Sequence, residues 1–284
     1  MQKELKGRPI TKKIYRQLKS RIELHKLKPK LVVIIIGKDP AAEYYVKMLE
    51  KKGKKIGLIV DTLKFEKDIS QEKLLLHIKE LNNKTDVNGI MIQKPLPNQI
   101  NESQIISMIN YKKDVDAMHP LNIGNMVLDQ EGFIPCTPAA VLEMLKFYNI
   151  ETQGRNIIII GRSDIVGKPL ANLFLRKNET GNATVTICHS RTKNLVSHTK
   201  KADILITAIG KPQFVKKEMI KKNSIVIDVG VNQIEDKEKG KIYVGDVDYD
   251  DCYHKSLFIT PVPGGVGSVT TSLLLKNVVD ACEK

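Results

Sequence analysis

Short runs of aliphatic and β-branched residues alternate along the chain with longer segments of helical periodicity. Continuous apolar runs such as 31–36 and 156–160 are typical of strands buried on both faces of a parallel sheet. The intervening segments are long enough for crossover helices, so the pattern predicts an α/β fold built from βαβ units. The predicted strands are 31–36, 59–63, 89–93, 156–160, 184–188, 204–208, 224–229 and 257–260. The predicted helices are 11–25, 40–56, 71–81, 138–147, 166–175 and 270–281.

The length and punctuation of the chain indicate two domains. Its 284 residues suffice for two α/β domains, each with its own core, and there is no internal repeat or low-complexity linker. The prolines of the PCTP segment, 135–138, mark the expected break, with Thr137 as the N-cap of the next helix. The second half has the pattern of a doubly wound nucleotide-binding domain.

The composition is that of a soluble globular protein, with 42% hydrophobic and 27% charged residues. The N-terminus lacks an apolar signal core, and no run approaches the roughly 18 apolar residues that span a bilayer. The four cysteines are widely spaced without a C-x-x-C pair, which favours reduced thiols over a disulfide framework or a metal site. We therefore expect a cytoplasmic protein with no membrane partner and no metal.

The net charge of +14 raises the question of a nucleic-acid partner. Most of the charge is lysine scattered over many segments, and the chain has no tryptophan, no zinc-finger spacing and no stacking motif for base recognition. We expect no nucleic-acid partner, and a basic nucleic-acid-binding module remains a remote alternative.

A glycine-containing turn in the second half has the setting of a dinucleotide site. The segment GRSDIVGKP, 161–169, follows a predicted strand and opens a predicted helix. Such a turn and helix N-terminus bind pyrophosphate, although the spacing of Gly161, Ser163 and Gly167 departs from G-x-G-x-x-G. Ligands of such a domain bind beyond the carboxyl ends of its strands, and four predicted strand ends here carry small or polar residues.

The residues after the strand 184–188 bear on the choice of cofactor. A free ribose 2′-hydroxyl usually meets an acidic residue there, whereas a 2′-phosphate favours arginine and hydroxyl groups. Here the chain continues with His189, Ser190 and Arg191, and Arg162 lies in the preceding turn. NADP is favoured over NAD, while a solvated turn at Ser190 and Arg191 is the alternative.

Several segments together carry a family resemblance. They are YV at 45–46, QKPLP at 93–97, KDVDAMHP at 113–120, PCTP at 135–138, GRSDIVGKP at 161–169 and TPVPGGVG at 260–267. In this order and spacing the chain resembles the bifunctional methylenetetrahydrofolate dehydrogenase/methenyltetrahydrofolate cyclohydrolase family over essentially its whole length.

The resemblance implies an α/β fold of two domains with a cleft between them. A folate-binding catalytic domain would comprise residues 1–138 and 268–284, and a Rossmann-type doubly wound NADP domain would comprise residues 139–267. The resemblance also implies a homodimer that binds tetrahydrofolate derivatives, with or without a polyglutamate tail, and serves one-carbon metabolism and purine biosynthesis.

The resemblance further assigns site residues by position. It implies catalytic roles for Tyr45, Gln93 and Asp116. Tyr45 and Asp116 would bind folate together with the loop residues Pro263, Gly264 and Gly265. The cofactor-binding residues would be Gly161, Arg162, Ser163, Ser190, Arg191 and Val231. Without the resemblance, a core tyrosine, a turn glutamine and a helix-capping aspartate would be the simpler interpretations.

One departure from the family pattern affects the expected activity. The lysine that the family places four residues after the tyrosine, and to which hydrolysis is assigned, is Leu49 here. We therefore expect NADP-dependent oxidation of 5,10-methylenetetrahydrofolate to the 5,10-methenyl form, with the cyclohydrolase step to 10-formyltetrahydrofolate in doubt. The alternatives are a full bifunctional enzyme in which Lys94 or Lys52 substitutes, and a non-catalytic homologue that binds folate or NADP.

Overall fold

The computed structural model describes residues 3–236, 238 and 240–284. The chain divides into two compact units. The amino-terminal unit comprises residues 13–134 and 271–284, and the Rossmann-type unit comprises residues 3–12 and 135–270. Helices α1 (Gly7–Leu24) and α10 (Val266–Glu283) each contribute residues to both units.

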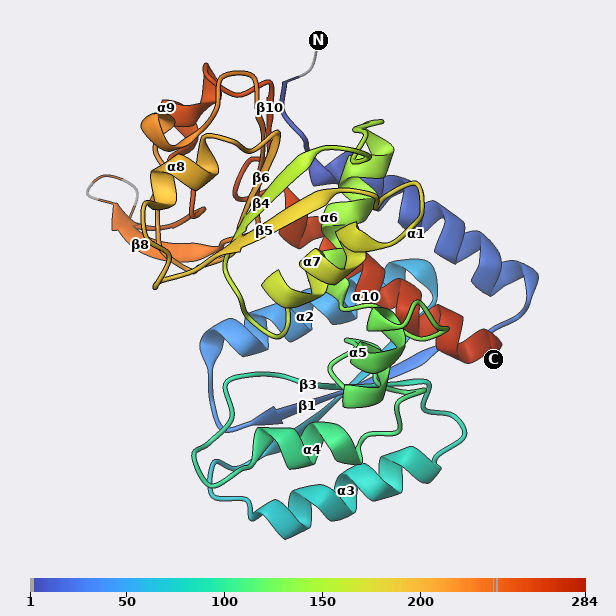
Figure 1. Ribbon diagram of the computed structural model, residues 1–284. Coiled ribbons are helices and arrows are strands. Elements are labelled where there is room, and N and C mark those ends of the chain that lie inside the picture. The colour runs from blue at the N-terminus through green and yellow to red at the C-terminus, as the bar shows by residue number, and fades with distance from the viewer. Residues whose placement is uncertain (1–2, 237, 239) are drawn as a thin grey trace. The chain divides into compact units, whose positions relative to one another are not determined.

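A three-stranded parallel sheet of order β2-β1-β3 forms the centre of the amino-terminal unit. Its strands are β1 (Lys30–Ile36), β2 (Ile59–Phe65) and β3 (Gly89–Ile92). Six of the seven residues of β1 are buried, which explains its unbroken apolar sequence. Alternate β1 side chains pack with the buried faces of α3 and α4, and Figure 1 shows α2 on the opposite face of this sheet. The helices along this part of the chain are α2 (Pro40–Ile56), α3 (Gln71–Asn83), α4 (Glu102–Met108) and α5 (Pro120–Val127).

Helix α2 is well specified at both ends by its sequence. A carboxylate oxygen of Asp39 accepts hydrogen bonds from the backbone N–H groups of Ala41 at 2.8 Å and Ala42 at 3.2 Å. Pro40 occupies the first turn, and Gly57 ends the helix in the left-handed conformation with φ +86°. The predicted limits of this helix are therefore confirmed.

The Rossmann-type unit contains a five-stranded parallel sheet of order β10-β7-β6-β4-β5. The chain passes from β4 to β5 on one side and then returns to β6 on the other side of β4. This order confirms the predicted doubly wound sheet and makes the β4–β6 boundary its topological switch point. The strands are β4 (Asn156–Ile160), β5 (Thr184–Cys188), β6 (Ile204–Thr207), β7 (Ile225–Asp228) and β10 (Phe258–Ile259). The helices are α6 (Cys136–Phe147), α7 (Gly167–Leu175), α8 (Leu195–Thr199) and α9 (Tyr249–Tyr253), with a short 3₁₀ helix η1 (Lys217–Met219).

The structure also contains elements that the apolar pattern did not predict. These are α4, α5, α8, α9, η1 and an antiparallel hairpin of β8 (Asn232–Asp236) and β9 (Gly240–Val244). Each helix among them is too short to show a clear apolar period. The hairpin alternates half-buried and exposed residues and contains charged side chains, which weakens its strand signal.

Three predicted helix starts were wrong. Helix α1 begins four residues earlier than predicted, at Gly7. Helix α6 begins at Cys136 with Pro135 at its N-cap, so Thr137 lies inside the first turn and is not the cap. Helix α10 begins four residues earlier than predicted, at Val266. Ser268 in its first turn supports this earlier start, because Ser268 Oγ donates a hydrogen bond to the carbonyl of Gly265 at 2.8 Å.

Candidate active site

A cavity of about 290 Å³ lies in the Rossmann-type unit at the carboxyl ends of β4, β5 and β6. Gly161 and Arg162 follow β4, Ser190 follows β5, and Ala208 and Lys211 follow β6. These loops meet at the switch point of the sheet, where doubly wound domains bind their ligands. Of the four strand ends singled out in the sequence, the cavity includes three, and the loop after β7 does not line it.

Glycines bring the loops of this cavity together. Gly161 has φ +129°, and a Cβ atom there would overlap the carbonyl oxygen of Ala208. A Cβ atom at Gly167 would likewise overlap the carbonyl oxygen of Gly161. Ser163 Oγ accepts a hydrogen bond from the backbone N–H of Val166 at 3.2 Å and so supports the start of α7. The turn therefore requires glycine at both position 161 and position 167.

The charge of the cavity suits an anionic cofactor. Arg162 and Lys211 line it, Ser190 adds a hydroxyl group, and within the part of the chain that the structure describes no acidic side chain lines it. Cationic and hydroxyl donors without a carboxylate match a phosphate-bearing dinucleotide. The residues present therefore fit NADP.

The structure distinguishes among the predicted cofactor residues. Gly161, Arg162 and Ser190 line the cavity, whereas Ser163 supports the helix next to it. Arg191 is exposed, and its backbone N–H donates to His189 Nδ1 at 3.1 Å. Val231 is 58% exposed. Neither Arg191 nor Val231 lines the cavity.

A buried aspartate that the sequence analysis missed holds the β6 loop in place. Asp246 is fully buried, and its carboxylate accepts hydrogen bonds from the backbone N–H groups of Ile209 at 2.7 Å and Lys211 at 2.8 Å. Gly210 and the amide of Asn232 donate to the same carboxylate. A single aspartate in a loop gives no distinctive sequence signal, and only its partners reveal its role.

The residues predicted to bind folate in the amino-terminal unit come from three elements. Tyr45 lies half-buried on α2, Gln93 follows the carboxyl end of β3, and Asp116 lies half-buried in the loop before α5. Gln93 Nε2 donates to the carbonyl of Lys94 at 3.1 Å, while its Oε1 is buried and has no hydrogen-bond partner among the described residues. Because buried acceptors are normally paired, this oxygen marks a position for a donor.

The two aspartates of the KDVDAMHP segment differ in their surroundings. Asp114 is 2% exposed and accepts hydrogen bonds from the backbone N–H groups of Met118 at 3.1 Å and His119 at 2.7 Å, and from Asn122 Nδ2 at 2.8 Å. Burial raises the pKa of its carboxyl group. Asp114 therefore shapes the loop, and Asp116 is the more accessible of the pair.

The glycine loop after β10 belongs to the Rossmann-type unit. Gly264 has φ +106°, a conformation that side-chain-bearing residues rarely adopt, and Pro263 is exposed. A Cβ atom at Gly265 would lie 2.5 Å from the carbonyl oxygen of Pro261. Both glycines are therefore required by the path of the backbone.

The position of the missing family lysine is buried. Leu49 is fully buried on α2. Lys52, two helical turns beyond Tyr45, is half-buried, and burial lowers the pKa of its ammonium group. Lys94 is exposed and forms an ion pair with Glu102 at 2.5 Å. The two lysines considered as substitutes thus lie in different environments.

The described residues contain neither a membrane-spanning helix nor a metal-binding cluster. No helix there has the length and apolar character needed to cross a membrane. No group of three or more His, Cys, Asp or Glu side chains within the described ranges is placed to hold a metal ion.

Taken together, the doubly wound sheet and its cationic cavity define a protein with a Rossmann-type dinucleotide-binding domain. The family model described as tetrahydrofolate dehydrogenase/cyclohydrolase, NAD(P)-binding domain, matches residues 135–284, and the model of the catalytic domain matches residues 5–116. The chain belongs to the tetrahydrofolate dehydrogenase/cyclohydrolase family.

Named relatives agree over the full length of the chain. The bifunctional protein FolD of Chlamydia felis is 43% identical over 282 residues, covering 99% of this chain and 98% of the relative. The bifunctional FolD structure of Campylobacter jejuni is 40% identical with a TM-score of 0.92 and covers 98% of each chain. The Trypanosoma brucei methylenetetrahydrofolate dehydrogenase-cyclohydrolase, solved in complex with NADP and an inhibitor, is 34% identical with a TM-score of 0.91, covering 98% of this chain and 96% of that one.

Proposed function

We propose that the chain oxidises 5,10-methylenetetrahydrofolate to 5,10-methenyltetrahydrofolate with NADP as the hydride acceptor. The observation that carries the proposal is the composition of the switch-point cavity. Its lining includes Arg162, Ser190 and Lys211, and none of the described lining residues is an aspartate or a glutamate. A 2′-phosphate finds cationic and hydroxyl donors there, whereas the 2′-hydroxyl of NAD finds no acidic partner. Relatives named as bifunctional FolD, and one relative bound to NADP, support this assignment.

The amino-terminal unit supplies the residues for folate. We assign Asp116 to the aminopyrimidine edge, where an ionised carboxylate accepts two N–H donors, and Tyr45 to the face of the ring system. The unpaired Oε1 of Gln93 is assigned to the one-carbon bridge. NADP supplies the hydride acceptor when it is bound. The role of these side chains is to orient the folate, because hydride loss from the methylene carbon requires no proton transfer from the protein.

The cyclohydrolase step, which is the second activity of the family, is proposed to be weak in this chain. Leucine at position 49 neither carries charge nor exchanges a proton, so hydrolysis of the methenyl bridge to 10-formyltetrahydrofolate lacks its family lysine. The second candidate function is the full bifunctional enzyme, with Lys52 in that role. Two features of Lys52 favour it. The side chain is half-buried, and burial lowers its pKa, so that a larger fraction of the amine is neutral at a given pH. The ion pair of Lys94 with Glu102 makes Lys94 the weaker substitute.

Further features remain proposals from the resemblance. The folate domain is proposed to span 1–138 and 268–284, and the NADP domain 139–267.

A homodimer is proposed to pair through the Rossmann-type unit. There β5 is an edge strand of the sheet and has a neighbouring strand on one side only within the described chain. Light scattering coupled to size-exclusion chromatography measures the mass of the assembly. A cytoplasmic location is proposed as well.

A steady-state assay with 5,10-methylenetetrahydrofolate tests the main proposal. NADP and NAD are compared as oxidants, and formation of the methenyl product is followed. We expect a kcat/KM with NADP at least about tenfold above that with NAD, which corresponds to about 1.4 kcal/mol. Tight binding of both ligands without any product would favour the non-catalytic homologue, and faster turnover with NAD would contradict the cofactor assignment.

A further inference from the structure

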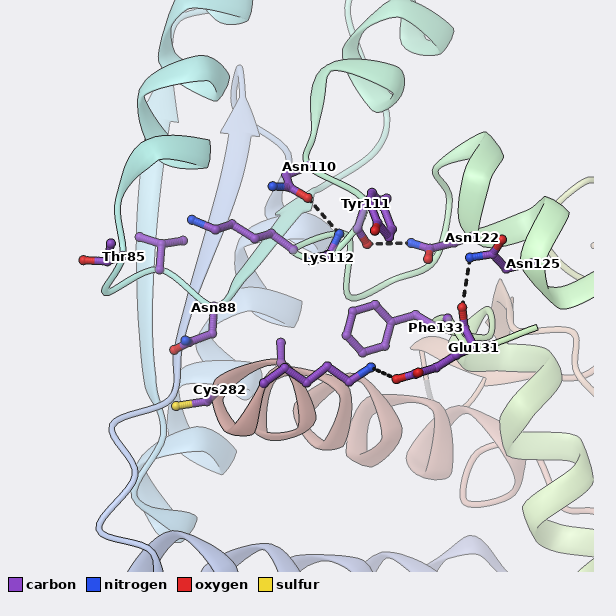
Figure 2. A pocket seen from close by; sticks show the side chains of 15 residues that line it. Thr85, Asn88, Asn110, Tyr111, Lys112, Asn122, Asn125, Glu131, Phe133 and Cys282 are labelled. Atoms are coloured by element: carbon purple, nitrogen blue, oxygen red, sulfur yellow. Dashed lines mark hydrogen bonds and ion pairs between the residues drawn. The ribbon is translucent and has the colours of Figure 1, made fainter.

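The amino-terminal unit contains a second cavity that no step of the proposed reaction uses. It has a volume of about 670 Å³ and lies where β3 begins, between the turn at 85–88, the loop at 110–113, the loop at 131–133 and the last turn of α10 (Figure 2). Gln93 follows the opposite, carboxyl end of β3. Tyr45, Gln93 and Asp116, the side chains assigned to folate, do not line this cavity, and its volume is in the range of small-molecule sites.

The walls of this cavity are fixed by hydrogen bonds. Lys113 Nζ donates to three carbonyl oxygens at the end of α3, those of Leu81 at 3.1 Å, Asn82 at 2.8 Å and Lys84 at 2.6 Å. On the other side, Asn122 Nδ2 donates to the carbonyl of Tyr111 and to Asp114, both at 2.8 Å. The loop that carries Tyr111 is thus held at both ends, and the cavity is pre-formed.

Asn122 presents an acceptor that nothing in the described chain satisfies. The side chain is fully buried, and its Oδ1 has no hydrogen-bond partner. Its orientation is settled, because both partners of the Nδ2 group are acceptors and a flipped amide would place oxygen against them. Oδ1 faces Gly132, where an added Cβ atom would lie 3.3 Å away. A buried acceptor in a cavity wall calls for an N–H or O–H donor from a ligand.

The remaining lining shows what else that ligand carries. Figure 2 shows Tyr111 and Asn122 on one side of the space and Phe133 and Glu131 on the other. Two aromatic rings provide flat apolar faces for a planar ring. Three lysines line the cavity against one carboxylate, and that carboxylate, Glu131, is paired with Lys284 at 2.5 Å. This balance favours an anionic substituent.

We propose that this cavity is a second ligand site, which binds a planar nitrogen heterocycle with an anionic substituent. A ring N–H donates to Asn122 Oδ1, the ring lies between Tyr111 and Phe133, and the anion lies toward Lys112. Both a free heteroaromatic acid and a nucleotide have this chemistry. Orotate and uridine monophosphate represent the two sources, since each combines a pyrimidine N–H with an anionic group.

Cys282 offers a reporter for occupancy. It lines the cavity, and it is the one cysteine of the four that is not buried. The rate of its alkylation by iodoacetamide is measured by peptide mass spectrometry with NADP at saturation, so that the cofactor cavity is filled. We expect orotate or uridine monophosphate to slow alkylation on the order of tenfold when the probe exceeds its Kd by about that factor. Protection by uridine monophosphate alone identifies a nucleotide site, and protection by orotate alone identifies a site for a free acid.

Variants tie the effect to this cavity. Gly132→Val fills the space next to Asn122 and should abolish protection, whereas Gly124→Ala, whose added Cβ meets nothing within 4 Å, should retain it. Lys112→Ala, at an exposed position, should weaken binding on the order of tenfold, equivalent to about 1.4 kcal/mol, and serves if Gly132→Val does not fold. The absence of protection by both probes would overturn the proposal. Equal protection by ribose 5-phosphate, which has no heterocycle, would also overturn it. So would protection that survives in both Gly132→Val and Lys112→Ala.

Discussion

The Asp228 carboxylate is linked to the backbone of Asp246: Asp228 Oδ1 accepts a hydrogen bond from the backbone N–H of Asp246 at 3.0 Å. Both side chains are almost wholly buried, and a Cβ atom at Gly230 would overlap the Asp246 carboxylate. Asp228 also accepts from the backbone N–H groups of Gly230 and Val247. The two acids therefore fix the loops after β7 and β9, and Asp246 extends this order to the β6 loop of the cofactor cavity.

This pairing predicts a stability that depends on pH. Burial raises the pKa of Asp228 to about 7, and the charge of Asp246 adds to the effect. The folded protein then holds this proton up to about pH 7, whereas the unfolded chain releases it near about pH 4. Because the folded state binds more protons in that window, the free energy of unfolding falls as pH rises, by at most about 1.4 kcal/mol per pH unit and about 4 kcal/mol in total.

Asp228→Asn isolates this contribution, since an amide does not ionise. Urea denaturation of both proteins across about pH 4 to 8 should show that the free energy of unfolding of the natural protein falls as pH rises. This fall should be smaller in the variant, whatever the difference in absolute stability between the two proteins. Parallel pH profiles would show that Asp228 is ionised throughout.

Asp246→Ala should weaken NADP binding while leaving folate binding intact. The variant removes the acceptor of three consecutive backbone N–H groups, those of residues 209–211, and Lys211 lines the cofactor cavity. Hydrogen bonds to a charged group contribute about 1.5–3 kcal/mol, so loss of loop order should lower NADP affinity by roughly tenfold or more. Fluorescence titration with NADP and with folate measures both, and an equal loss of the two affinities would indicate a general folding defect.

Arg191→Ala should reduce the preference for NADP over NAD. A charge-assisted contact to the 2′-phosphate contributes of order 1.5–3 kcal/mol, so the preference should fall by roughly one to two orders of magnitude. Lys193→Ala, at an exposed position two residues away, is the matched control for charge. Arg191 does not line the cavity, so Arg162→Ala is tested beside it. Unchanged NADP affinity in Arg191→Ala with a loss in Arg162→Ala would assign the contact to Arg162.

Asp116→Ala and Asp114→Ala should separate binding from folding. Removal of the Asp116 carboxylate should weaken folate binding and leave NADP binding and the melting temperature nearly unchanged. Asp114→Ala leaves two backbone N–H groups of the loop without their acceptor and removes one hydrogen bond from Asn122 of α5, so it should lower stability by about 1–3 kcal/mol or more. Calorimetry and folate titration on both proteins decide the point. A similar melting temperature and a similar folate affinity in the two variants would contradict the division of roles.

The sequence was most informative where the chain is regular. The isoleucines of β4 and the capped helix α2 were predictable, because apolar runs and capping residues determine local structure directly. The turn at Gly161 could be placed at the cofactor cavity for the same reason, since its strand and helix flank it.

Contacts between distant segments were not predictable in this way. Asp246 is 35 residues from Lys211 in the chain, yet its carboxylate holds the Lys211 loop of the cofactor cavity. Asn122 is 10 residues from Gly132, and the two line the same second cavity. In the sequence, an aspartate or an asparagine looks the same whether its side chain is solvated or buried. The roles of these residues depend on tertiary packing, which a single sequence does not display.

Leu49→Lys tests whether the two activities of the family have been separated. A lysine at position 49 would lie one helical turn from Tyr45 on the same face of α2, and burial would lower its pKa toward that of a useful base. General acid–base groups contribute typically about 10²–10⁴-fold, so hydrolysis of added 5,10-methenyltetrahydrofolate should rise by a comparable factor. Because Leu49 is fully buried, Leu49→Met controls for altered packing, and it should give no gain in hydrolysis. If the natural protein already hydrolyses the substrate well above the uncatalysed rate, the separation is disproved, and Lys52→Ala and Lys94→Ala then identify the amine responsible. Loss of hydrolysis in Lys52→Ala alone would assign the role to the half-buried lysine of α2.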